Sequence, residues 1–485
     1  LGFKGNCGAV YYEMLCKYTD AQGQLQCATA QRPSDNHFEP WDVDIRRNTT
    51  SPLAVIVGGS GPFNCGQIFA TDDWGCTWAE EAHEWASPNP PAHCNGDTSI
   101  TNPNPQLEEG FVTLYGVGMF DGDGTAVVCG YGGLQAQRPA GPAGVYWQDR
   151  SYYGHPESGA STVFFPLYGA EADAGSSGNG KGWIAGTGNL IRRTIDGGAT
   201  YWNGGPGFTH EGGLDDEFRI HDVYFWDNLN GWYCGQFHRL AKSPDEGKTF
   251  LKAASIPFHI TWPYLHSVVV AGDTLHGVCV GKAENSTSFP ELRYTADNDL
   301  WLTAAAVPWK GSSIAFQNST LYEVDWARDA LSREFWTVGQ VGMILRSSDG
   351  GQNWTHLEPQ GVSRPTLRAH EFQSISCYGP TNAFLVGKRP DALGNDEGVI
   401  YLLTWSGTQL SWSLKFAGAG FSVILDVEAF DASTVYAVGT KIESTDQIGV
   451  VLKWNRTTFA EPNGAPTLTA SPTIEPNEGN EEPLR

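Results

Sequence analysis

The sequence predicts an all-β protein built from repeated four-stranded units. Two features carry this prediction: an apolar strand closed by a glycine recurs eight times, and a turn of the form Ser/Thr-x-Asp-x-Gly-x-x-aromatic keeps the same rhythm. Self-similarity with a period of roughly 40–60 residues is typical of repeat folds. The strand-closing glycines are Gly58, Gly130, Gly186, Gly235, Gly281, Gly339, Gly387 and Gly439.

Each unit has the pattern of four short antiparallel strands. The clearest copy, FWTVGQVGMILRSSDGGQNW at 335–354, holds the second and third strands and the turn after them. The strand before it, LYEVDW at 321–326, alternates apolar and polar residues as a half-buried strand does. Turns rich in Asn, Asp and Gly, such as DNLNG at 227–231, suit hairpins. Four-stranded units of this length predict a single β-propeller. We favour eight blades, with seven possible if the divergent second unit is an insertion.

The aspartate turn has a structural explanation. Its Asp or Ser side chain can accept hydrogen bonds from backbone N–H groups, its glycine supplies an unusual backbone angle, and its aromatic residue packs beneath the turn. We therefore interpret these aspartates as structural. They are Asp73, Asp196, Asp245, Asp297 and Asp349, with Asp149 expected at the corresponding place in the second unit, and Ser406 and Asn455 in the last two.

These repeats resemble the Asp-box (BNR) repeat family. The unit VYFWDNLNGWYCGQFHRLAKSPDEGKTF at 223–250 is similar to the repeats of photosystem II assembly-factor-like propellers, and sialidase and sortilin propellers share the same box. The resemblance covers about residues 40–460. It implies a propeller fold but no single function, because the box is a turn that occurs in enzymes, receptors and assembly factors alike.

Three regions are expected along the chain. Residues 1–40 form a Cys-rich N-terminal extension, residues 41–459 the propeller, and residues 460–485 an extended tail rich in Pro, Thr and Glu. The composition of the tail cannot build a hydrophobic core. We expect the tail to dock along the propeller or into a neighbouring subunit as an extended or polyproline segment.

Charge narrows the choice of partners. The net charge is −24, with only 30 Lys and Arg residues, and no apolar stretch is long enough to span a membrane. Nucleic acids and anionic membranes both require basic patches, so we expect neither as a partner.

Cysteines and glycosylation motifs indicate secretion. Six of the ten cysteines precede residue 100, as expected of disulfides formed in an oxidising compartment. These candidates are Cys7, Cys16, Cys27, Cys65, Cys76 and Cys94. Cys129, Cys234 and Cys279 replace valine in strands and are expected to be buried hydrophobes. Five Asn-x-Ser/Thr motifs are candidates for N-glycans. They lie at Asn48, Asn285, Asn318, Asn353 and Asn455.

A few residues allow a chemical interpretation beside a plainer one. Arg219, in FRIHD, resembles an arginine that grips a carboxylate in sialidases, although coincidence at the start of a strand also explains it. Asp121 and Asp123, in DGDG, could ligate Ca²⁺, but a hairpin turn is the simpler explanation. We expect no other metal or cofactor.

Histidines and aromatic residues gather in the middle of the chain. The histidines could meet near a central channel, where hydrogen-bonded loop positions are the simpler interpretation. They are His210, His221, His238, His259 and His266. Aromatic residues at 145–155 and 261–266 suit sugar stacking, a protein interface or packing between blades.

From these features we expect a secreted, glycosylated and non-catalytic propeller. It would act as a structural or protein-interaction module, with copies of itself as partners through its terminal extensions. The alternatives are a glycan-active enzyme of sialidase-like type, a glycan-binding lectin or receptor module, and an assembly factor of the photosystem type.

Overall fold

A computed structural model describes the chain between residues 38 and 460, with gaps. The longest gaps are 82–113, 150–166, 204–219 and 254–263. Residues 1–37 and 461–485 lie outside the described part.

The described strands form eight sheets of four antiparallel strands each, in sequence order. The first four sheets are β1 (Phe38–Ile45), β2 (Ala54–Ser60), β3 (Cys65–Thr71) and β4 (Ala79–Glu80); β5 (Leu114–Met119), β6 (Ala126–Gly130), β7 (Gln135–Arg138) and β8 (Gln148–Asp149); β9 (Leu167–Ala172), β10 (Gly182–Gly186), β11 (Ile191–Thr194) and β12 (Trp202–Asn203); and β13 (Ile220–Phe225), β14 (Gly231–Gly235), β15 (Arg239–Ser243) and β16 (Leu251–Lys252).

The other four sheets follow the same plan. They are β17 (Leu265–Val270), β18 (Gly277–Gly281), β19 (Glu291–Thr295) and β20 (Leu302–Thr303); β21 (Leu321–Trp326), β22 (Phe335–Gly339), β23 (Ile344–Ser347) and β24 (Thr355–His356); β25 (Glu371–Gly379), β26 (Asn382–Pro390), β27 (Asp396–Trp405) and β28 (Leu410–Gly418); and β29 (Phe421–Asp431), β30 (Thr434–Glu443), β31 (Asp446–Trp454) and β32 (Phe459–Ala460). Short helices lie in the connections, namely η6 (Ser313–Phe316), η7 (Gln340–Gly342) and α1 (Arg364–Arg368).

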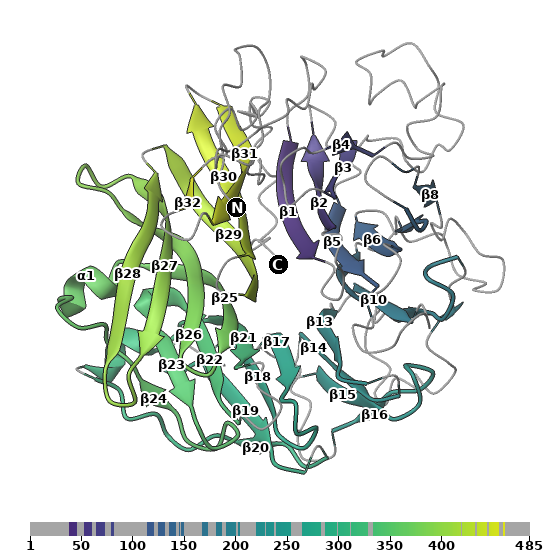
Figure 1. The fold of residues 1–485 in the computed structure, drawn as a ribbon. Helices are drawn as coiled ribbons and strands as arrows, with labels where there is room; N and C mark the ends of the chain where they lie inside the picture. The colour runs from purple at the N-terminus through teal and green to yellow at the C-terminus, as the bar shows by residue number, and fades with distance from the viewer. Residues whose placement is uncertain are drawn as a thin grey trace, which may run out of the picture.

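The sheets close into a ring around a central axis (Figure 1). The first strand of each sheet contacts the first strand of the next, and β29 of the last sheet returns to β1 of the first. The predicted β-propeller is therefore confirmed. Within the described residues, no helix is long and apolar enough to cross a membrane.

A bulge recurs opposite every strand-closing glycine. In each sheet the register between the first two strands shifts by one residue there, as between Leu321 and Glu323 of β21, opposite Gly339. A Cβ atom on Gly339 would overlap the carbonyl oxygen of Thr320. A Cβ atom on Gly281 would likewise overlap the carbonyl oxygen of Tyr264, and other glycines of the set meet a backbone carbonyl in the same way. The glycine recurs because the bulged first strand approaches its backbone too closely for any side chain.

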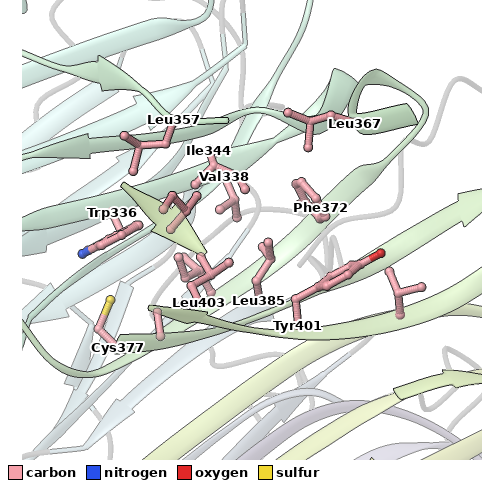
Figure 2. Close-up of a cluster of buried hydrophobic side chains, with 14 residues drawn as sticks. Trp336, Val338, Ile344, Leu357, Leu367, Phe372, Cys377, Leu385, Tyr401 and Leu403 are labelled. Carbon is pink, nitrogen blue, oxygen red and sulfur yellow. The ribbon is translucent and has the colours of Figure 1, made fainter. Parts of the chain in front are cut away.

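Apolar side chains between neighbouring sheets form the core (Figure 2). Trp336, Val338 and Ile344 of the sixth sheet face Phe372 and Leu385 of the seventh. Each sheet of the ring has a neighbour on both faces, which is why the second strands β18 and β22 are buried at every residue and mostly apolar.

The aspartate turns join the third and fourth strands at one end of the ring, which we call the box end. In the sixth sheet the Ser347 hydroxyl donates to Asp349 Oδ1 at 2.9 Å and accepts from the Gly351 N–H at 2.9 Å. Asp349 Oδ1 also accepts from the Asn353 N–H at 3.0 Å. Burial raises the pKa of Asp349, but these hydrogen bonds outweigh it and the net shift is downward.

The second sheet has no such turn. Arg138 pairs with the first residue of its second strand, as Ser347 does in the sixth sheet, so Arg138 holds the place of the turn Ser/Thr. Asp149 lies instead in β8 opposite Ala136, and the expected placement of Asp149 in the turn is wrong. The cause is the sequence RPAGPAGVYWQD, in which Arg138 replaces Ser/Thr and no Asp follows two residues later.

A buried ion pair joins the first two sheets at this place. Arg138 and Glu81 are both fully buried, with Arg138 Nη2 donating to Glu81 Oε1 at 2.7 Å. Arg138 also donates to the carbonyl of Gly141 at 3.0 Å, and Trp147 Nε1 donates to Glu81 Oε2 at 2.5 Å. Both charges are thus hydrogen-bonded on several sides, as buried charges must be.

Candidate binding surface at the bulge end

The bulges lie at the opposite end of the ring, which we call the bulge end. One residue per sheet is left out of the ladder there, and six of these eight are Trp, Tyr or His. The bulged residues are Trp41, Tyr115, Tyr168, His221, His266, Tyr322, Gln373 and Leu425. A bulge turns a side chain out of the regular pleat, and bulges are frequent beside binding sites.

In the fourth to sixth sheets the bulged side chains touch one another. His221 Nδ1 lies 3.3 Å from His266 Nδ1. The His266 ring lies 6.0 Å from the Tyr322 ring, and the His221 ring stacks 5.7 Å from the Tyr264 ring. The Lys282 ammonium group lies 5.9 Å from the centre of the Tyr264 ring. Of the five predicted histidines, the structure therefore brings two together.

Polar groups extend this arc into the seventh sheet. The Tyr322 hydroxyl donates to Glu371 Oε1 at 2.9 Å and accepts from Gln340 Nε2 at 2.8 Å. Lys388 lies 3.6 Å from Glu371 and 3.0 Å from Asp396. Burial lowers the pKa of Lys388, but Asp396 and Glu371 raise it by more than burial lowers it. The net shift is upward, so the ammonium group is held in its charged form.

A cavity of about 440 Å³ opens on the same end of the seventh sheet. It lies between the loop that carries α1 and strands β26 to β28, and its lining includes Val362, His370, Arg389, Tyr401 and Trp412. Trp412 stacks on Tyr401 with ring centroids 4.1 Å apart and the planes 10° from parallel. The cavity thus combines an aromatic wall with one arginine, and its size is that of a small-ligand or peptide pocket.

Hydrogen bonds fix the side chains of this cavity. His370 Nδ1 lies 2.9 Å from the carbonyl oxygen of Thr366, and this oxygen can only accept, so Nδ1 carries the proton. His370 Nε2 then accepts from the Tyr401 hydroxyl at 2.8 Å, and the Tyr401 oxygen accepts from Arg389 Nη1 at 2.9 Å. Glu397 holds Arg389 Nε at 3.0 Å.

The pKa shifts agree with this arrangement. Burial lowers the pKa of His370 and raises the pKa of Tyr401 to about 12, so both rings are neutral near pH 7. The Arg389 guanidinium is therefore held by neutral tyrosine on one side and by Glu397 on the other. Its Nη2 makes no hydrogen bond with the described residues, while the side chain is 28% exposed.

A second aromatic cluster lies beside the cavity loop, between the fifth and sixth sheets. Trp309 and Phe316 stack at 4.5 Å, His356 packs edge-on at 4.8 Å from Phe316, and the Arg368 guanidinium lies 5.2 Å from the Phe316 ring. Ile314, next to Phe316, is 73% exposed. Sequence patterns do not reveal the Trp309 cluster, whose residues come mostly from connections that do not repeat. They do not reveal the cavity either, because one connection and three strands of the seventh sheet form it together.

Several expected site residues lie outside the described part of the chain. These are Arg219, Asp121, Asp123, Asp73, His210, His238, His259, Asn48, Asn285, Asn455, Cys7, Cys16, Cys27, Cys76 and Cys94. Only the backbone of Cys65 is described, in β3. Among the described residues, no group of three or more His, Cys, Asp or Glu side chains is placed to hold a metal ion.

Two candidate glycosylation sites are described, and both are exposed. Asn318 has a positive φ of 54° and follows η6. Asn353 lies in the box turn, where its Nδ2 donates to Asp349 Oδ2 at 2.7 Å. Asn353 therefore has a structural role whether or not it carries a glycan.

The described strand cysteines, namely Cys129, Cys234, Cys279 and Cys377, are all buried. Burial raises the pKa of the Cys234 thiol, and the neighbouring Cys279 raises it further. The first three were expected to be small buried hydrophobes, and the structure places them so.

Comparisons with known proteins give fold-level likeness. The chain is similar to a structure of YCF48 bound to D1 peptide, with 15% identity, 70% of this chain and 93% of that chain covered, and a TM-score of 0.43. It is similar to YCF48 from Cyanidioschyzon merolae, with 12% identity over 70% of this chain and 95% of that chain and a TM-score of 0.44. It is also similar to Sqt1 of Saccharomyces cerevisiae, with 11% identity over 72% and 84% of the two chains and a TM-score of 0.44.

No protein-family model matches the chain, and no curated protein matches it. Likeness at this level carries no information about function.

Proposed function

We propose that this chain is a secreted, glycosylated and non-catalytic protein-interaction module that assembles with other copies of itself. One observation supports the proposal most: six of the eight bulged residues at one end of the ring are Trp, Tyr or His. A bulge needs no aromatic side chain, so the fold does not account for this choice.

Aromatic residues suit a protein interface in particular. Trp and Tyr give large contact areas with little loss of side-chain entropy, and they are enriched in interfaces together with Arg. Tyr322 adds a hydroxyl already oriented by Gln340 and Glu371. The two aromatic-lined features beside the arc, the cavity and the Trp309 cluster, widen this surface.

Sedimentation velocity of the full chain at several concentrations tests self-assembly. We expect concentration-dependent oligomers, weakened by Tyr322→Ala and unchanged by Leu229→Ala, which alters an exposed side chain at the box end. A wild-type chain that stays monomeric at every concentration contradicts the proposal. So does a loss of assembly on Leu229→Ala alone.

Secretion and glycosylation have a separate test. We propose N-glycans at Asn48, Asn285, Asn318, Asn353 and Asn455, and disulfides among the six N-terminal cysteines. Mass spectrometry of the native protein, before and after glycosidase and before and after reduction, should show both modifications. Unmodified asparagines and free thiols throughout would exclude this part of the proposal.

A further inference from the structure

The cavity of the seventh sheet has two features of a peptide site. Its wall is the Tyr401–Trp412 stack, to which Val362 and the exposed Leu414 add apolar surface. Its polar group is Arg389, oriented by Glu397 and Tyr401, with Nη2 left for a ligand. Aromatic-lined grooves of this kind bind proline-rich segments, because such segments are already extended and lose little entropy on binding.

The chain carries a segment of matching chemistry. Residues 461–485 contain five prolines and five glutamates but a single basic residue, Arg485. Within them, Pro472-Thr-Ile-Glu-Pro476 places the apolar Ile474 beside Glu475, between two prolines. Ile474 fits the apolar wall, and Glu475 fits the guanidinium group of Arg389 through a charge-assisted hydrogen bond.

The place where the described chain ends brings this segment within reach. The last strand, β32, ends at Ala460 and contacts β28, the strand that carries Trp412 and Leu414. A fully extended segment covers roughly 3.3 Å per residue, so the dozen or so residues between Ala460 and Pro472 span on the order of 40 Å. A tether of this length gives the segment a high effective concentration at a site on the same chain.

We propose that the cavity of the seventh sheet is the docking site for residues 472–476 of the same chain. Ile474 packs against Trp412 and Leu414, and Glu475 accepts from Arg389 Nη2. The inference concerns this intramolecular contact and does not depend on the self-assembly proposed above.

Photo-crosslinking of the full-length protein tests this contact. A p-benzoylphenylalanine residue replaces Leu414, which lines the cavity and is 44% exposed. The matched control carries it at Leu302, which is 42% exposed on β20 of the fifth sheet. An equal mixture of unlabelled and ¹⁵N-labelled protein separates contacts within one chain from contacts between chains.

We expect cross-links from position 414 to residues 472–476 within one chain, at about tenfold the yield from position 302. Glu475→Gln and Arg389→Ala should each reduce the yield about tenfold, the effect of one lost charge-assisted hydrogen bond. Glu461→Gln is the control that should change nothing. Absence of tail cross-links, equal yields from both positions, or cross-links only between chains would overturn the proposal.

The same samples separate this inference from the proposed function. If the tail does not cross-link to the cavity while sedimentation shows oligomers, only the tail contact fails. If the tail cross-links within one chain and the protein is a monomer, the tail contact stands and self-assembly fails.

Discussion

At the box end of the ring the same side chains recur in four sheets, whereas at the bulge end the bulge and its glycine recur but the bulged side chains differ. Thr194, Ser243, Thr295 and Ser347 make the same hydrogen bond to an aspartate two residues later. The bulged positions, by contrast, hold Trp, Tyr, His, Gln or Leu on one backbone shape. The comparison indicates that folding determines the side chains of the box end, while the bulged side chains are free to vary, as the proposed binding surface requires.

The largest expected effect on stability concerns the second sheet, which has a buried ion pair in place of the aspartate turn at the box end. Arg138→Met would leave the Glu81 carboxylate buried and unpaired, which should cost about 3–5 kcal/mol of stability. Urea unfolding followed by Trp fluorescence measures this loss. The double variant Glu81→Leu/Arg138→Met should recover most of the lost stability. A single variant as stable as the wild type would show that the ion pair does not stabilise this sheet.

Acid should weaken the Trp309 cluster through His356. Burial lowers the pKa of His356 to about 4, with Lys310, Arg368 and Arg364 acting in the same direction and Glu358 opposing them. The unfolded chain therefore binds a proton first as the pH falls, so the stability contributed by neutral His356 is complete above pH 6.5 and lost toward pH 4.

This loss should be on the order of 3 kcal/mol. Unfolding midpoints at pH 7.5 and pH 4.5 measure it, and His356→Leu should make the difference smaller. A wild-type midpoint that does not change over this range contradicts the buried neutral histidine.

Gly339→Ala tests the close approach at the bulge end. The new methyl group would overlap the backbone of Thr320, and strain of this kind costs about 1–3 kcal/mol. Gly379→Ala is the matched control, because nothing lies within 4 Å of a Cβ at Gly379. Equal stability of the two variants, measured by thermal unfolding, would mean that the recurring glycine has another cause.

The smallest effect is expected from a single box turn. Ser347→Ala removes the acceptor of the buried Gly351 N–H and should cost about 1 kcal/mol. The same variant should leave self-assembly unchanged, as judged by sedimentation. A clear loss of assembly would place binding at the box end and reverse the comparison.

The repeating parts of this structure could be predicted from the sequence, and the non-repeating parts could not. The eight glycines and the turn aspartates marked the second strands and the turns, because the same local geometry requires the same residue each time. Asp149 shows the limit of this approach. Its spacing predicts a place in an aspartate turn, but Arg138 replaces the Ser/Thr of that turn and Asp149 lies in β8.

The candidate binding surface, too, could be predicted from the sequence only in part. Of the residues considered for sites, His221 and His266 do meet, at 3.3 Å. Tyr322 and Gln373 each follow the residue that pairs with the strand-closing glycine, and this pairing is known only from the structure. The cavity at Arg389 and Trp412 had no such pattern, because it depends on how one loop and three long strands pack in space.

Electron cryomicroscopy of native particles tests the central claim most directly, that the bulge end binds and the box end does not. We expect assemblies in which the contacts between copies include the bulged residues His266 and Tyr322, with the turns at Asp245 and Asp349 facing solvent. Isolated single rings, or contacts formed through the box turns, would contradict this account.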